Sequence, residues 1–169
     1  EMKYVMFSLD CELGWGLYDQ RGRNPAAIRM ETNSDLGRDA YRSLLTMFDT
    51  FDIPATWAFV GHLFLDMCSH GSHHSNDRID DIDPYSALES EPFYYGRDVV
   101  DAISESIVDH EIAGHGFSHS YFDELSKIGA REELSELVGA AENMNIDIKS
   151  FVYPRNRSGF ETLLPEFDI

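Results

Sequence analysis

The sequence predicts a single α/β domain built on a mainly parallel sheet. Its 169 residues suit one domain, and 43% hydrophobic residues are enough to fill a sizeable core. Short apolar segments rich in strand formers alternate with longer segments that carry a helical stripe. Parallel strands need a crossover connection, which is usually a helix, so this alternation favours a parallel sheet over residues 1–169.

The first strand and the first helix are expected in the N-terminal third. Residues 3–9 ("KYVMFSL") form an apolar run, as expected for a parallel strand covered on both faces. In residues 35–51, apolar side chains recur at the spacing i, i+3, i+4 and i+7 of one helix face: Tyr41, Leu44, Leu45 and Phe48. Pro54 ends this unit.

The later elements repeat the pattern. We expect strands at residues 55–61, 110–114 and 148–154, and helices at residues 97–108 and 131–144. The last helix should turn four apolar side chains inward: Leu134, Leu137, Val138 and Ala141.

Residues 68–95 interrupt this rhythm with a polar segment rich in Ser, Asp, His and Pro. A loop of this length inside a compact domain is usually either functional or disordered. It carries a possible second ligand cluster, although its spacing matches no standard zinc module: Cys68, His70, His73 and His74.

The net charge is strongly negative, because 31 acidic residues face 13 basic ones and leave a charge of -18. Such a surface repels a phosphate backbone, so nucleic acid is excluded as a partner. The acids are spread along the chain, which we interpret as an adaptation to high salt; an ordinary acidic protein is the alternative.

Membrane insertion and export find no support in the sequence. No apolar run reaches the ~18 residues of a membrane span, and no export signal is visible. The two cysteines, Cys11 and Cys68, are too few for a disulfide framework, which favours a reduced, cytoplasmic protein. A leader removed ahead of Glu1 stays open as an alternative, and the sequence does not indicate an oligomeric state.

Polar residues follow four of the predicted strands, where the carboxyl ends of parallel strands meet. They are Asp10 and Glu12, then His62, then His115 and His119, and finally Arg155 and Asn156. A pair of histidines four apart also arises on exposed helices. One carboxylate with two imidazoles, however, makes a three-ligand catalytic zinc site, and a second carboxylate beside it supplies a general base.

Four segments resemble the polysaccharide deacetylase family, the metal-dependent carbohydrate esterases with a NodB-homology domain. They are "FSLDCE" (7–12), "PATWAFVG" (54–61), "EIAGHGFSHSYF" (111–122) and "SFVYPRN" (150–156), in the family's order and spacing. The resemblance implies part of a distorted (β/α) barrel and a hydrolase that removes N-acetyl or O-acetyl groups from a saccharide. Together with the acidic composition, it leads us to expect a haloarchaeal member.

The resemblance also implies a role for each matching residue. Asp10 resembles the family's catalytic base, and Glu12, His115 and His119 resemble the ligands of Zn²⁺, or of Co²⁺, Ni²⁺ or Mn²⁺ in its place. Cys11 stands where some members have a second aspartate, so it is interpreted as a packed thiol. Arg155 is expected to orient the base, although the family's arginine precedes the proline, where this chain has Val152.

Three residues are expected to contact the saccharide: Trp15, Tyr153 and Asn156. A core position is the alternative for Trp15. Family domains continue with strands that carry a late histidine, so we expect this chain to lack its C-terminal strands.

Two other functions stay open on the same residues. One is hydrolysis of another non-peptide C–N bond, by a deformylase of a lipid-linked amino sugar or a cyclic amide hydrolase. The other is a carbohydrate-binding descendant without activity. Asp10 beside both histidines argues against the latter, because a binding module needs no base.

Overall fold

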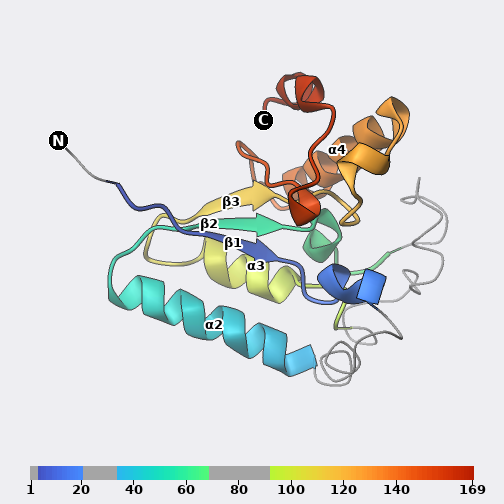
Figure 1. The fold of residues 1–169 in the computed structure, drawn as a ribbon. Helices are drawn as coiled ribbons and strands as arrows, with labels where there is room; N and C mark the ends of the chain where they lie inside the picture. The colour runs from blue at the N-terminus through green and yellow to red at the C-terminus, as the bar shows by residue number, and fades with distance from the viewer. Residues whose placement is uncertain (1–3, 21–33, 69–91) are drawn as a thin grey trace.

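A three-stranded parallel sheet forms the centre of the molecule (Figure 1). The computed structural model describes residues 4–20, 34–68 and 92–169. The strands are β1 (Ser8–Cys11), β2 (Thr56–Phe59) and β3 (Glu111–Gly114), in the spatial order β1-β2-β3. The α/β fold class with a parallel sheet is therefore confirmed.

The three strands end at the same level. Cys11 is paired with Phe59, and Phe59 with Gly114, so the last residues of the strands stand side by side. Glu12 is the first residue after β1, and His115 is the first residue after β3. The register therefore delivers both residues to one edge of the sheet.

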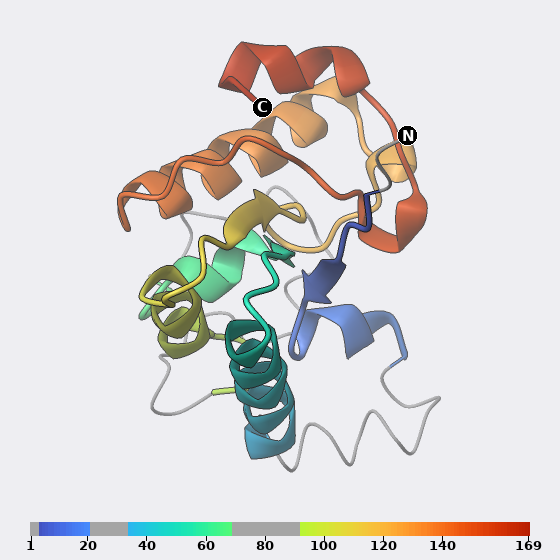
Figure 2. The same ribbon diagram turned by 90° about the vertical axis from the view of Figure 1, so that its left-hand side faces the viewer.

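Helices cover both faces of the sheet. α2 (Ser34–Thr50) and α3 (Arg97–Ser104) lie on one face, and α4 (Lys127–Glu142) lies on the other (Figures 1 and 2). The side chain of Ser126 caps α4 by accepting a hydrogen bond of 3.1 Å from the Gly129 N–H. Five short 3₁₀ segments complete the described elements: η1 (Trp15–Gln20), η2 (Gly61–Phe64), η3 (Phe122–Glu124), η4 (Pro154–Asn156) and η5 (Glu161–Phe167).

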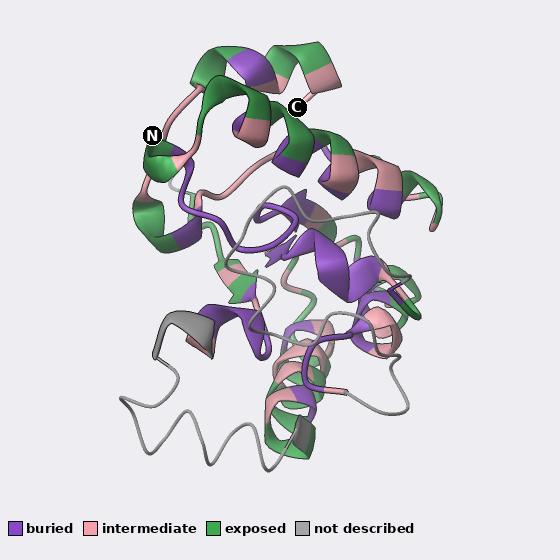
Figure 3. Ribbon diagram, turned by 90° about the vertical axis from the view of Figure 1, so that its right-hand side faces the viewer, coloured by how far each residue is buried: buried purple, intermediate pink, exposed green. Residues whose placement is uncertain are grey.

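The core lies between the sheet and its helices (Figure 3). Its largest cluster includes Trp15, Trp57 and Phe59, and a smaller one forms between α4 and η5 around Phe122 and Leu163. Four side chains were expected to point inward from α4. Leu134, Leu137 and Ala141 are buried, and Val138 is half-buried.

The predicted position of the first strand is wrong. Residues 4–7 have no regular structure, and Tyr4, Val5 and Met6 are exposed by 81%, 81% and 86%. Among the described residues β1 is an edge strand, and its pairing with β2 begins only at Ser8. Phe7, the residue before Ser8, packs its ring 5.5 Å from that of Phe48 on α2, whereas the three residues before it extend past the paired part of the sheet, and an apolar run alone does not bury itself.

The predicted fourth strand is reduced to one parallel bridge between Gly114 and Phe151. The Gly114 N–H donates to the Ser150 carbonyl at 2.9 Å, and the Val152 N–H donates to the Gly114 carbonyl at 2.8 Å. Pro154 has no N–H to extend this ladder. The segment still runs beside β3 and carries Arg155 to the same edge of the sheet.

Most of the predicted polar loop, with His70, His73 and His74, lies outside the described residues. Cys68 is described, and its side chain is buried. Among the helices of the described ranges, none has the length and apolar character that crossing a membrane requires.

Candidate metal centre

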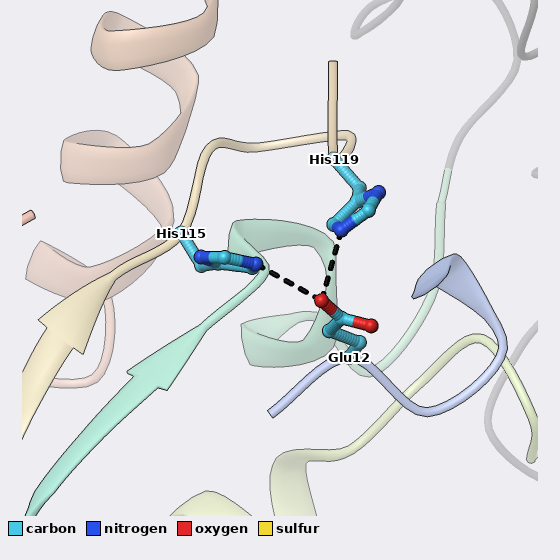
Figure 4. A group of neighbouring side chains, drawn as sticks. All are labelled: Glu12, His115 and His119. Atoms are coloured by element: carbon cyan, nitrogen blue, oxygen red, sulfur yellow. Dashed lines mark hydrogen bonds and ion pairs between the residues drawn. The ribbon is translucent and has the colours of Figure 1, made fainter. Parts of the chain in front are cut away.

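Glu12, His115 and His119 converge at the carboxyl edge of the sheet (Figure 4). Each offers one ligand atom, and these three atoms lie within 4.8 Å of one another. Both histidines are fully buried, whereas the Glu12 side chain is 22% exposed. The three residues that sequence reasoning selected as ligands are thus brought together.

The histidines are carried by a turn. Their spacing suggested one face of a helical turn, but residues 115–120 are not helical. Gly116 has φ +74° and His119 has φ +59°, which is the left-handed region that side chains rarely adopt. The turn continues beside the end of β2, since the Gly61 N–H donates to the Gly116 carbonyl at 2.8 Å. His119 therefore faces His115 through a left-handed backbone that costs roughly 1 kcal/mol.

Hydrogen bonding fixes the tautomer of His115. Its Nδ1 lies 2.8 Å from the carbonyl oxygen of Val152, which can only accept, so Nδ1 carries the proton. In the neutral ring the lone pair is then on Nε2, which lies 3.1 Å from Oε1 of Glu12. A backbone carbonyl behind a histidine is also the usual way in which a metal-binding imidazole is oriented.

A single carboxylate oxygen faces both imidazoles. Nε2 of His119 lies 3.0 Å from the same Oε1 of Glu12. In the tautomer that leaves the lone pair of His119 on Nε2, three electron-rich atoms meet here, and they repel one another unless a proton or a cation stands between them. One carboxylate with two imidazoles is a donor set that Zn²⁺ accepts, so this cluster could hold a metal ion.

The environment keeps Glu12 ionised. Burial by itself raises the pKa of the Glu12 carboxyl, but when the rings of His115 and His119 are protonated, their hydrogen bonds and charges lower it by more than burial raises it. The net result is a pKa far below the ordinary range of a glutamate. The site therefore presents a negative charge to a bound cation.

Gly16 makes room for the Glu12 carboxylate. A Cβ atom at Gly16 would lie 1.6 Å from Oε2 of Glu12, which is impossible without displacing that carboxylate. The carbonyl of Gly16 also accepts a hydrogen bond of 2.6 Å from the Arg155 guanidinium. Arg155 thus holds the backbone against which Glu12 rests, and the described contacts do not place it on Asp10.

Asp10 and Cys11 lie on opposite sides of β1. Asp10 is exposed, and its carboxylate has no hydrogen bond or ion pair with the described residues. Cys11 is fully buried, and burial, with the charges of Asp10 and Glu12 added, raises the pKa of its thiol well above the usual value. This fits the interpretation of Cys11 as a packed thiol.

The residues expected to contact a saccharide lie in different surroundings. Trp15 is fully buried, and its indole N–H donates to the Tyr94 carbonyl at 3.0 Å. A sugar stacks only on an open aromatic face, so the assignment of Trp15 as a saccharide contact is corrected to its alternative, a core position. Tyr153 is half-buried, with its ring 4.9 Å from that of Phe151, and Asn156 is exposed.

Sequence reasoning missed Glu133, a fully buried carboxylate on α4. It accepts hydrogen bonds from the N–H groups of Phe117 and Ser118, at 2.8 and 3.0 Å, in the turn between the two histidines. Burial raises the pKa of Glu133, and these hydrogen bonds oppose that rise. The helix pattern offers a signal that was not used: Glu133 follows the buried Ala130 by three residues and precedes the buried Leu137 by four, whereas the exposed Glu132 falls outside this stripe.

Comparison with known proteins gives similarity in structure and none in sequence. No protein-family model matches this chain, and no curated protein matches it. A crystal structure from Mycobacterium smegmatis, assigned to the polysaccharide deacetylases, aligns with a TM-score of 0.62 at 21% identity over 97% of this chain. The alignment covers 48% of that protein, so the chain spans about half of its length.

A second similar structure is the deacetylase PplD of Streptococcus pyogenes in complex with acetate. It aligns with a TM-score of 0.55 at 11% identity, over 99% of this chain and 81% of that one. The resemblance predicted from four sequence segments is thereby confirmed for the fold, which is the barrel-type fold of the polysaccharide deacetylases.

Proposed function

We propose that this chain is the catalytic part of a metal-dependent hydrolase that removes N-acetyl or O-acetyl groups from a saccharide. The observation that carries the proposal is the single carboxylate oxygen of Glu12, shared by Nε2 of His115 and of His119. The deacetylase fold supports the same reaction class.

The residues of the cluster fit a divalent cation. Glu12, His115 and His119 would hold Zn²⁺, or Co²⁺, Ni²⁺ or Mn²⁺ in its place, as a three-ligand set with an open position. A cation bound there would polarise the acetyl carbonyl and lower the pKa of a water molecule to about 7.

Asp10 is assigned the role of general base. Its carboxylate is exposed two residues before Glu12 and has no competing partner among the described residues. An oxygen of Asp10 would accept the proton of the attacking water. Arg155 acts indirectly in this proposal, because its guanidinium holds the Gly16 carbonyl under Glu12. Tyr153 and Asn156, on the neighbouring segment, would line the saccharide.

The test compares two carboxylate substitutions in the full-length protein, loaded with Zn²⁺ and assayed in high salt. Asp10→Asn keeps the size of the side chain and removes its capacity to take a proton. We expect turnover of an acetylated saccharide, measured as acetate release, to fall by roughly 10²–10⁴ with little change in Zn²⁺ affinity. Glu12→Gln should instead weaken Zn²⁺ binding.

Each contrary outcome points to a different assignment. Release of Zn²⁺ by Asp10→Asn, with Zn²⁺ retained by Glu12→Gln, would reverse the two roles. Turnover of formylated or cyclic amide substrates alone would move the chain to another class of C–N hydrolase. A Zn²⁺-loaded wild-type protein that turns over none of these substrates would favour a saccharide-binding role.

A further inference from the structure

Glu133 lies in the interior beneath the turn that carries the two histidines. Its Oε2 accepts both backbone N–H groups, from Phe117 at 2.8 Å and from Ser118 at 3.0 Å. Its Oε1 accepts the hydroxyl of Ser118 and that of Ser120, the latter at 3.2 Å. A buried carboxylate is tolerated when it is hydrogen-bonded in this way.

The turn itself forms an anion-binding concavity. After Gly116 in the left-handed region, two successive N–H groups point at one oxygen, which is the geometry of a backbone nest. A Cβ at Gly116 would lie 3.3 Å from Oε2 of Glu133, so the carboxylate sits close against the backbone. Glu133 fills this concavity from α4.

The opposite side of the turn is fixed by η2. The carbonyls of Gly116 and Phe117 accept the N–H groups of Gly61 and His62, at 2.8 and 3.0 Å. The peptide units between the histidines are thus held through their carbonyls by one element and through their N–H groups by Glu133. Without Glu133, only the carbonyl side of this clamp remains.

We propose that Glu133 is a positioning residue for the metal site. It sets the placement of His119 relative to His115, so the affinity and the coordination geometry of a bound cation depend on a carboxylate that is not a ligand. This inference rests on the proposed function only in using the same three ligands.

The test measures cation binding directly. Glu133→Gln keeps the volume of the side chain but leaves one acceptor oxygen in place of two, so either the two N–H groups or the hydroxyls of Ser118 and Ser120 lose their acceptor. We expect the Kd for Zn²⁺ to rise about 10–100-fold, as for other groups that orient ligands, and the visible absorption of bound Co²⁺ to change. Glu132→Gln is the matched control, because it makes the same charge change at the exposed neighbour and should behave as wild type.

A milder variant covers the case in which Glu133→Gln does not fold. Ser120→Ala removes one hydroxyl from the clamp and should raise the Kd for Zn²⁺ by roughly 3–10-fold, with a smaller change in the Co²⁺ spectrum. The proposal is overturned if either folded variant binds Zn²⁺ as tightly as Glu132→Gln and gives the same Co²⁺ spectrum.

Failure of the proposed function gives a different result. A wild-type protein that binds Zn²⁺ and releases no acetate would contradict the hydrolase while leaving both binding measurements intact. The role of Glu133 can therefore be decided whether or not the substrate is correctly identified.

Discussion

Strand β3 has a histidine at each end, His110 before it and His115 after it, and the two side chains differ in what they can bind. Both are fully buried, and each lies beside a carboxylate, that of Asp49 or of Glu12. Nδ1 of His110 accepts the Ala55 N–H at 3.1 Å, so the proton lies on Nε2 and is donated to Asp49 at 3.2 Å. Both ring nitrogens of His110 are therefore satisfied within the fold.

The partner of Nδ1 makes the difference. An N–H group at His110 places the ring proton toward the carboxylate, whereas the Val152 carbonyl at His115 places the proton away from it. The surroundings agree with this contrast, because the rings of Phe48 and Trp57 lie near His110, while the ring of His119 lies 5.2 Å from that of His115. Burial beside a carboxylate therefore does not identify a ligand; the hydrogen bond behind the ring does.

The largest expected effect concerns His115, the histidine of this pair that we propose as a metal ligand. His115→Ala, and equally His119→Ala, should weaken Zn²⁺ binding by more than about 100-fold, the upper range for groups that only orient ligands. Isothermal titration measures this, with His110→Ala as the control that keeps wild-type affinity. If His110→Ala also weakened Zn²⁺ binding, the metal site would depend on His110, and the distinction between the two histidines would fail.

An intermediate effect concerns His110, whose hydrogen bonds stabilise the fold. His110→Ala should lower the free energy of unfolding by about 1–3 kcal/mol, because the Ala55 N–H and Asp49 lose a buried partner. Urea denaturation without added metal measures it. His115→Ala should lower it less, since Glu12 keeps His119 as a partner and is partly exposed. An equal loss of unfolding free energy in His110→Ala and His115→Ala would contradict the assignment of His110 as the more structural residue.

The smallest expected effect sharpens the comparison at the Glu12 carboxylate. Gly16→Ala would force this carboxylate aside and should weaken Zn²⁺ binding roughly 10-fold, within the range of changes that disturb ligand orientation. Gly139→Ala is the control, because a Cβ there meets nothing within 4 Å on helix α4. It should leave Zn²⁺ affinity unchanged and raise stability by about 0.5–1 kcal/mol. A wild-type affinity for Gly16→Ala would show that Glu12 is not held by this backbone.

The sequence predicted those parts of the fold whose pattern is local. Periodic apolar positions located α2, α3 and α4, and short apolar runs located β2 and β3. The start of β1 was missed because burial depends on a neighbouring strand, which Tyr4 and Val5 lack among the described residues. The fourth strand shrank to a bridge because pairing with β3 is set by distant partners and stopped by Pro154.

The sequence likewise predicted one part of the candidate site and missed another. The convergence of Glu12, His115 and His119 was predicted from motifs that follow the strands. The contact of Arg155 with Gly16 spans 139 residues, and no spacing rule reports such a contact. Helical spacing places Glu133, unlike Glu132, on the buried stripe of α4, but no spacing rule reports that its carboxylate contacts the turn between the histidines.

The alternation of β1 has a consequence for how this segment can vary. Ser8 and Asp10 are exposed, whereas Leu9 is half-buried and Cys11 is buried, so the chemistry of the strand depends on even against odd positions. A substitution changes the side chain at one position and leaves the alternation of the others intact. A single inserted or deleted residue ahead of Asp10 would exchange the two sets, turning the Cys11 thiol outward and the Asp10 carboxylate into the core. Residues 8–11 can therefore accept changes of side chain far more readily than changes of length.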